Sequence, residues 1–72
     1  MENNVNIAIG MRIRKLRNEK TGLSQEKFAN KVGLDRTYFS AIELGKHSAT
    51  VSVLSKVAQG LGISLEELFR GT

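Results

Sequence analysis

The chain is 72 residues long, with no cysteine, one histidine and a formal charge of +4 from eleven Lys and Arg against seven Asp and Glu. This length fits one domain, and the absence of cysteine excludes disulfides, cysteine zinc ligands and a thiol nucleophile. A core this small makes dimerisation a reasonable expectation. No apolar run approaches a membrane span and the start lacks the features of a signal peptide, so we expect a cytoplasmic protein with no membrane partner.

The positive charge is concentrated in the first half of the chain. Residues 1–36 hold eight basic and four acidic side chains, whereas residues 37–72 hold three of each. The excess is greatest over residues 12–20, where five basic side chains accompany one glutamate. Such a run indicates a polyanionic partner, nucleic acid before an anionic membrane surface, unless it is only a solvated helix face. The core needs the apolar face of this segment, which disfavours the membrane.

Five short helices are predicted from apolar spacing and capping residues, over residues 5–20, 25–32, 36–44, 51–61 and 65–69. Ile9, Ile13 and Leu16 share one face of the first, where Gly10 would let a neighbouring element approach closely. The other four helices follow residues that make good N-caps: Ser24, Asp35, Thr50 and Ser64. Residues 5–9 alternate like a strand but have no partner strand in the chain, so we interpret them as helical.

The second and third helices are joined by a three-residue turn that begins at Gly33, the arrangement of a helix-turn-helix. Ala29 is small where the two helices must pass closely, and Gly33 suits the left-handed backbone of the turn. Five further positions are apolar, as packing requires: Phe28, Val32, Leu34, Phe39 and Ile42. Each match is weak alone, but together they favour a helix-turn-helix over an ordinary helical corner.

The run LSQEKFANKVGLDRTYFSAIELGK at residues 23–46 resembles the Cro/repressor-type helix-turn-helix family, and GISLEELF at 62–69 extends the likeness. Within that family, IGMRIRKLR and DRTYFS look most like the controller proteins of restriction–modification systems. The resemblance covers about residues 7–69. Three positions depart from the family pattern: Thr21 looks like an added residue, Leu44 replaces a polar one, and Ala49 stands where proline is common.

The resemblance implies an all-α, five-helix, lambda-repressor-like DNA-binding domain over residues 1–72, with a short N-terminal arm at residues 1–5. It implies a transcriptional regulator that binds a double-stranded, pseudo-palindromic operator in a sequence-specific manner as a homodimer. The alternative is a protein-interaction module such as an antitoxin subunit, which we disfavour because only three residues follow the last predicted helix.

The third helix, the second of the helix-turn-helix, is the predicted recognition helix in the major groove. Phe39 and Ile42 define its buried side, and short side chains lie opposite. Arg36 is the long forked donor at its start, suited to guanine O6 and N7, although a phosphate contact is the alternative. The candidates for base contact are Arg36, Thr37, Ser40 and Ala41.

The candidates for contact with the DNA backbone are Gln25, Tyr38, Lys46, His47 and Ser48. Gln25 stands in the first turn of the second helix, where free N–H groups favour a phosphate. Tyr38 could pack on the sugar-phosphate backbone or on a base step, or it could only shield Ile42. The resemblance implies that Gln25 also braces the third helix and that the loop at residues 46–48 lies along the DNA.

Two further expectations concern structure rather than base readout. The resemblance implies a partly buried ion pair between Arg17 and Glu43, which flanks Phe39 on the helical wheel and so faces the domain. The second half of the chain carries more apolar surface than one small core readily hides, so we expect a two-fold dimer interface. Its candidate residues are Val51, Val53, Ile63, Leu65 and Phe69. Such a dimer would place its recognition helices roughly 34 Å apart.

The sequence carries no pattern typical of catalysis. It has no nucleophile–base pair, glycine-rich phosphate loop, cluster of metal ligands or spaced carboxylate pair. We therefore expect neither an enzyme nor a bound metal or cofactor. No small-molecule effector is evident, and the predicted partners are double-stranded DNA and a second copy of the chain.

Overall fold

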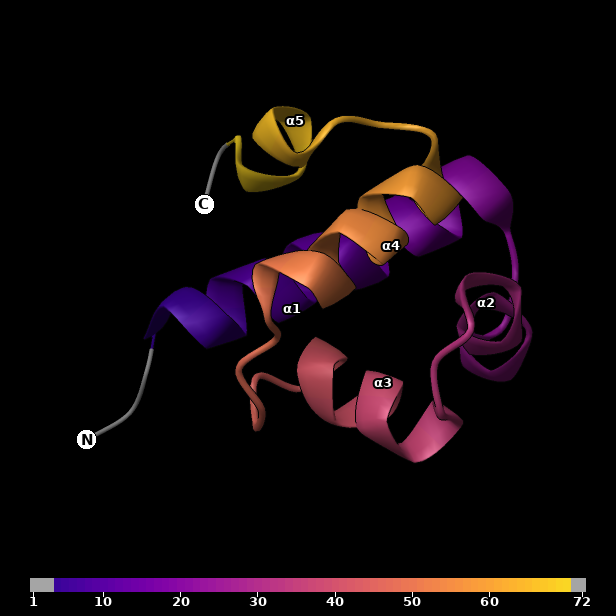
Figure 1. Ribbon diagram of the computed structural model, residues 1–72, viewed down its shortest axis with the longest axis horizontal. Coiled ribbons are helices and arrows are strands. Elements are labelled where there is room, and N and C mark those ends of the chain that lie inside the picture. The colour runs from indigo at the N-terminus through magenta and orange to yellow at the C-terminus, as the bar shows by residue number, and fades with distance from the viewer. Residues whose placement is uncertain (1–3, 71–72) are drawn as a thin grey trace.

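The computed structural model describes residues 4–70, which form five α-helices and one π-helical turn (Figure 1). The helices are α1 (Asn4–Leu16), α2 (Gln25–Val32), α3 (Arg36–Glu43), α4 (Val51–Leu61) and α5 (Leu65–Phe69), and the π-helical turn is η1 (Arg17–Thr21). No strand occurs within residues 4–70, so the prediction of an all-α, five-helix fold is confirmed. None of these helices is long and apolar enough to cross a lipid bilayer.

The helix starts lie where the capping residues predicted them. The side chains of the four N-caps accept backbone N–H groups three residues on, at 3.1–3.2 Å: Ser24 from Lys27, Asp35 from Tyr38, Thr50 from Val53 and Ser64 from Glu67. The third helix ends one residue earlier than predicted, because Leu44 is its C-cap and Gly45, with φ of +76°, turns the chain away.

The first helix departs from the prediction at both of its ends. Of the predicted arm at residues 1–5, residues 1–3 lie outside the described part of the chain, and Asn4 and Val5 belong to α1. At the other end the α-helix stops at Leu16 and continues as η1.

The π-helical turn accommodates the residue that looked additional to the family pattern. Gly22 N donates to Arg17 O at 3.1 Å, five residues back, which is the π-helical spacing. The Thr21 hydroxyl donates to the same carbonyl at 2.7 Å and accepts from Leu23 N at 3.0 Å. The π-helical turn therefore ends at Thr21, and α2 begins at Gln25 as predicted.

All five helices contribute to one hydrophobic core. The Phe28 and Phe39 rings join α2 to α3, with centroids 5.3 Å apart. The buried hydrophobic residues are Ile9, Ile13, Leu16, Phe28, Ala29, Phe39, Ile42, Leu54, Val57, Ala58, Leu61 and Leu68. α1 contacts α3 and α5, whereas α2 contacts α3 and α4. This arrangement leaves one side of α3 uncovered, along the lower edge of the molecule in Figure 1.

Two glycines bring α1 very close to the end of α3. A Cβ atom at Gly10 would clash with the carbonyl oxygens of Ile42 and Glu43, standing 2.5 Å from the latter. A Cβ atom at Gly45 would stand 2.8 Å from Ile7 Cα. The close approach expected at Gly10 is therefore present, and the neighbour is the last turn of α3.

Candidate nucleic-acid interface

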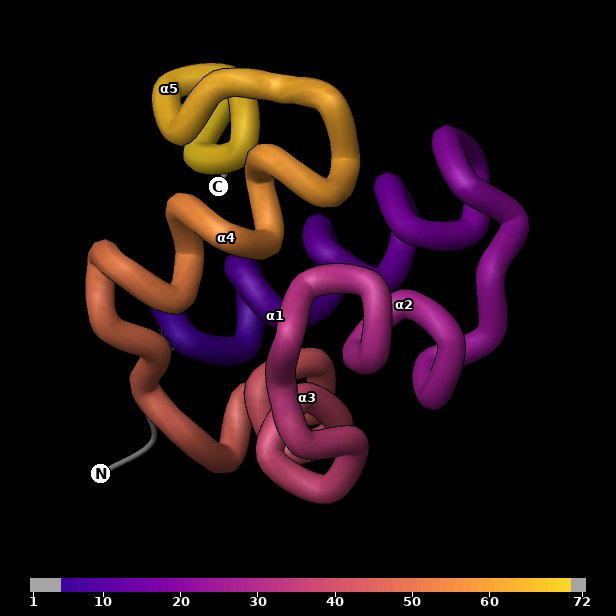
Figure 2. The backbone as a smooth tube through the Cα atoms, turned by 45° about the vertical axis from the view of Figure 1, so that its right-hand side comes forward, coloured from indigo at the N-terminus to yellow at the C-terminus, as the bar shows by residue number. Residues whose placement is uncertain are grey.

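The turn between α2 and α3 is built by Gly33, whose φ of +75° ends α2. Leu34 N donates to Ala29 O at 2.8 Å and Gly33 N to Asn30 O at 3.2 Å, so the carbonyls at the end of α2 find partners within the turn. The chain then enters α3 through the Asp35 N-cap, and Figure 2 follows this path. The two helices and the turn are thus fixed by local hydrogen bonds as well as by the core.

The uncovered side of α3 carries the four side chains predicted to contact bases. Arg36 and Thr37 are exposed at the start of the helix, and Ser40 and Ala41 are half-buried one turn later. Phe39 and Ile42 lie on the opposite, buried side. The accessible face therefore has one long cationic side chain at its start and short side chains behind it, so the helix can approach a surface closely.

Leu44 extends the same face at the end of α3. It is seven residues beyond Thr37, close to two helical turns, and is 57% exposed. A leucine in this place adds apolar surface where the family pattern has a polar side chain.

A buried polar cluster holds the end of α3 in place. Glu43 Oε2 accepts from Arg17 Nε at 2.8 Å, and Glu43 Oε1 accepts from Arg17 Nη2 at 3.2 Å and from Gln25 Nε2 at 2.8 Å. The Arg17 side chain is 8% exposed and that of Glu43 is 1% exposed. Arg17 Nη1 also donates to Leu23 O at 2.7 Å. The two charges thus satisfy each other through a forked pair, which links η1, α2 and α3.

The predicted backbone-contacting residues lie at the start of α2, on α3 and in the loop after α3. Lys46, His47 and Ser48 are exposed in the loop after α3, and Tyr38 is half-buried with its ring centroid 6.0 Å from that of His47. Gln25 is half-buried and gives its side-chain amide to Glu43, so the bracing of α3 is visible in its contacts.

Sequence reasoning missed Asn6, which supports this loop from α1. Asn6 Nδ2 donates to Ser48 Oγ at 2.9 Å. The two residues are far apart in the chain, and no local pattern links them. Ile7, the residue after Asn6, packs against Gly45. The start of α1 therefore holds the loop that follows α3 in place.

The basic run of residues 12–20 is only partly available to a partner. Arg17 is buried against Glu43, and the half-buried Arg12 donates to the carbonyl oxygens of Glu67 and Leu68. The remaining cations of the run are exposed: Arg14, Lys15 and Lys20. The local excess of charge in the sequence therefore overstates the charge that the surface presents.

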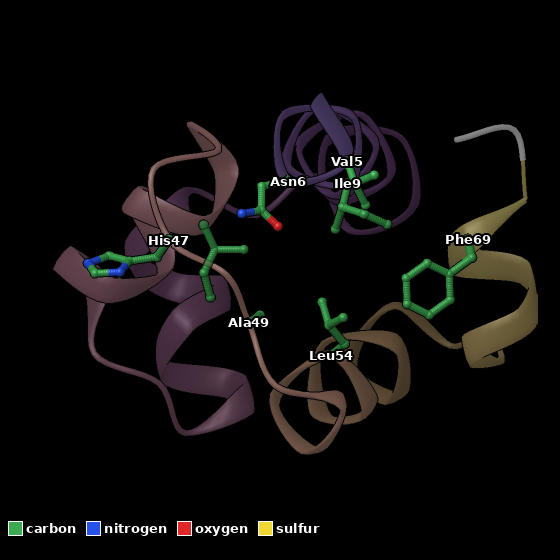
Figure 3. Close-up of a pocket in the computed structure, with 8 residues that line it drawn as sticks. Val5, Asn6, Ile9, His47, Ala49, Leu54 and Phe69 are labelled. Carbon is green, nitrogen blue, oxygen red and sulfur yellow. The ribbon is translucent and has the colours of Figure 1, made fainter. Parts of the chain in front are cut away.

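The predicted dimer residues divide into two groups. Val51 and Phe69 are 68% and 40% exposed. The other three are partly buried and pack against the core: Val53, Ile63 and Leu65. A largely apolar pocket of about 140 Å³ lies beside Phe69, and Figure 3 shows Phe69 from α5, Leu54 from α4 and Val5 from α1 around it. Val5 is 66% exposed and was missed because it belongs to the other end of the chain.

The fold, the turn and the packing of α2 on α3 define the class of protein: the chain belongs to the helix-turn-helix family, whose model matches residues 13–68. Among its relatives, the control protein C.MunI from Mycoplasma sp is 52% identical over 67 residues, which cover 93% of this chain and 90% of that protein.

Solved structures agree with this assignment. The restriction–modification controller protein C.AhdI from Aeromonas hydrophila has a TM-score of 0.86 and 38% identity, covering 92% of this chain and 98% of its own. The controller protein C.Esp1396I, crystallised as a tetramer with its natural 35 base-pair operator, has a TM-score of 0.83 and 35% identity, covering 94% and 92%. The resemblance to controller proteins that the sequence indicated is confirmed.

Proposed function

We propose that this protein is a transcriptional regulator that binds a double-stranded operator as a two-fold dimer and serves as the controller of a restriction–modification system. The observation that carries the proposal is the exposed face of α3, which begins with Arg36. The buried Arg17–Glu43 pair fixes the end of this helix on the side of the core. The operator complex of the related C.Esp1396I supports double-stranded DNA as the partner.

In this proposal α3 enters the major groove and reads base edges. Arg36 pairs with guanine O6 and N7, and Thr37, Ser40 and Ala41 make short-range contacts with neighbouring bases. The fork of an arginine carries most of the discrimination, because the other three side chains are short and offer at most one polar atom each. Close approach by the short side chains brings Arg36 within reach of the bases.

Contacts with phosphates orient the domain on the duplex. The proposed contacts come from the start of α2, from α3 and from the loop after α3: Gln25, Tyr38, Lys46, His47 and Ser48. The side chain of Gln25 is engaged by Glu43, so the first turn of α2 offers its free backbone N–H groups to a phosphate. Tyr38 and His47 lie together and present two rings to the sugar-phosphate backbone.

The dimer uses the exposed apolar residues of the second half of the chain. Val51 and Phe69 contact the second copy directly, and Val53, Ile63 and Leu65 support them from the core side. Two recognition helices related by a two-fold axis then match half-sites about 34 Å apart.

Selection of binding sites from a random duplex pool tests the proposal. We expect enrichment of a pseudo-palindromic site whose half-sites are one helical turn apart, with affinity that falls steeply as salt rises. Arg36→Ala should weaken the selected site by about tenfold or more, since a bidentate contact contributes about 1–3 kcal/mol, and should weaken random DNA much less.

Arg14→Ala is the matched control, because it removes the same charge from an exposed position on α1. It should lower the affinities for selected and random DNA by the same small factor. A pool without enrichment would contradict operator binding, and equal losses on both DNAs for Arg36→Ala would show that Arg36 contacts only phosphate.

In this proposal the protein acts by binding DNA and not by catalysis. It does so in the cytoplasm, where the operator and the gene that it controls are accessible. The relatives described above are controller proteins rather than enzymes, which supports a role without catalysis.

A further inference from the structure

The last turn of α5 is held by a side chain from α1. Arg12 Nε donates to Leu68 O at 3.1 Å, and Arg12 Nη2 donates to Glu67 O at 2.8 Å. Arg12 is half-buried between the two helices. One guanidinium group therefore contacts two successive carbonyl oxygens at the end of the chain's last helix.

This contact meets a specific need of α5. A helix of five residues does not form alone, and its last carbonyls have no partner within the helix. Glu67 O also accepts a 3.2 Å bond from Arg70 N. A cation at a helix C-terminus also complements the helix dipole. Arg12 therefore supplies both hydrogen bonds and charge where α5 is weakest.

The turn that Arg12 holds carries Leu68 and Phe69 in succession. Leu68 is fully buried and fixes the inner side of the turn. Phe69, the next residue, is 40% exposed and borders the apolar pocket, with its ring directed toward Leu54 in Figure 3. Arg12 therefore binds the carbonyl groups of the two residues that precede Phe69 in the chain.

The geometry points to Arg12 as a positioning residue for dimerisation: it fixes the last turn of α5 so that Phe69 is presented to a second copy of the chain. The inference rests on the dimer of the proposed function. Arg12 lies outside the predicted interface, yet the interface depends on it. Val5 and Phe69 are both exposed and both line the pocket, and an aromatic anchor beside a pocket is typical of the residues that dominate an interface.

Arg12 differs in its role from the exposed cations of the basic run. Its fork is engaged by carbonyl oxygens of its own domain, so it acts on DNA binding only through assembly. Arg14, two residues along α1, is exposed and provides a matched comparison with the same chemistry.

Sedimentation equilibrium with Arg12→Met and Arg14→Met tests the inference on the full chain. Methionine keeps an unbranched apolar stem and removes the donors. Loss of two charge-assisted hydrogen bonds should raise the dimer dissociation constant about tenfold or more for Arg12→Met. Arg14→Met should change it less than about twofold, as expected for an exposed substitution. Equal dissociation constants for the two variants would overturn the inference.

A double-mutant cycle with Phe69→Ala shows whether Arg12 acts through Phe69. When Phe69 is already alanine, adding Arg12→Met should raise the dissociation constant much less than it does in the wild-type chain. If the two effects multiply independently, Arg12 contributes only to the stability of the monomer and the positioning role is refuted. Circular dichroism of each variant at the same concentrations identifies any loss of folded monomer.

Arg12→Lys keeps the charge, and it tests the fork if the methionine variant fails to fold. A single ammonium group does not reproduce the planar fork, so the dissociation constant should rise at least about threefold. Full wild-type dimerisation by the lysine variant would contradict the proposed geometry. A wild-type chain that remains monomeric while still enriching an operator would refute this inference and the dimer but leave DNA binding intact.

Discussion

Removal of the Glu43 side chain should destabilise the domain more than almost any other single change. Its two oxygens accept three hydrogen bonds, two from Arg17 at 2.8 and 3.2 Å and one from Gln25 at 2.8 Å. Both charged side chains are almost fully buried. Glu43→Ala would leave the Arg17 guanidinium buried without its counter-charge, a situation that costs about 3–5 kcal/mol.

This cost is large for a chain of 72 residues, because a domain of that length has a free energy of unfolding of about 4–11 kcal/mol. Each kcal/mol shifts the melting temperature of so small a domain by about 4–8 °C, so Glu43→Ala should lower it by about 12 °C or more. Thermal unfolding followed by circular dichroism measures the shift. Glu19→Ala, at an exposed glutamate of η1, is the control and should change the melting temperature by only a few degrees.

A melting temperature for Glu43→Ala close to that of Glu19→Ala would refute the assignment of a stabilising role to the buried pair. A second variant separates the cost of an unpaired charge from the cost of lost packing. The double variant Arg17→Met with Glu43→Leu replaces both charges by apolar groups, and should be more stable than Glu43→Ala. If it is less stable, the hydrogen bonds and not the unpaired charge dominate.

Three further changes test how α1, η1 and α4 are held. Gly10→Ala should cost about 1–3 kcal/mol in urea unfolding, because its Cβ meets the carbonyl of Glu43 at 2.5 Å; an unchanged urea midpoint would contradict the close approach. Thr21→Val keeps the branched shape but removes the hydroxyl that bonds to Arg17 O and Leu23 N, and should cost about 1–2 kcal/mol in the same assay. Equal stability would mean that the π-helical turn forms without this hydroxyl. Thr50→Ala removes the N-cap of α4 and should cost about 1 kcal/mol, and Thr50→Ser should restore most of the loss.

Local chemistry is sufficient to predict where the last four helices of this protein begin. Ser24, Asp35, Thr50 and Ser64 are short side chains with an acceptor oxygen just before an apolar stripe, and each caps a helix in the structure. The signal is strong because the N-cap bond joins residues only three positions apart. The end of the first helix carries no such signal, since the same apolar spacing fits an α-helix and the π-helical turn η1.

Contacts between distant residues explain what the sequence could not predict about the site. The Arg17–Glu43 pair was expected only because the chain resembles a known family. Asn6 and Ser48 meet across 42 positions, and nothing in either local sequence indicates the other. Val5 joins the apolar surface near Phe69 only because the fold brings the start of α1 beside the end of α5.

Folding makes part of the basic run at residues 12–20 inaccessible to a partner. In the sequence it indicates a polyanionic partner, yet Arg17 is neutralised by Glu43 and Arg12 is bound to carbonyl oxygens of α5. Within α3 and the loop that follows it, residues 36–50, the cations are Arg36 and Lys46. Because non-specific affinity grows with the number of phosphates neutralised, one domain with so few cations would bind random DNA weakly. Under the proposed function, affinity and specificity must then come from joining two such faces, so the contacts that hold Phe69 at the dimer surface matter to DNA binding as much as those that hold α3.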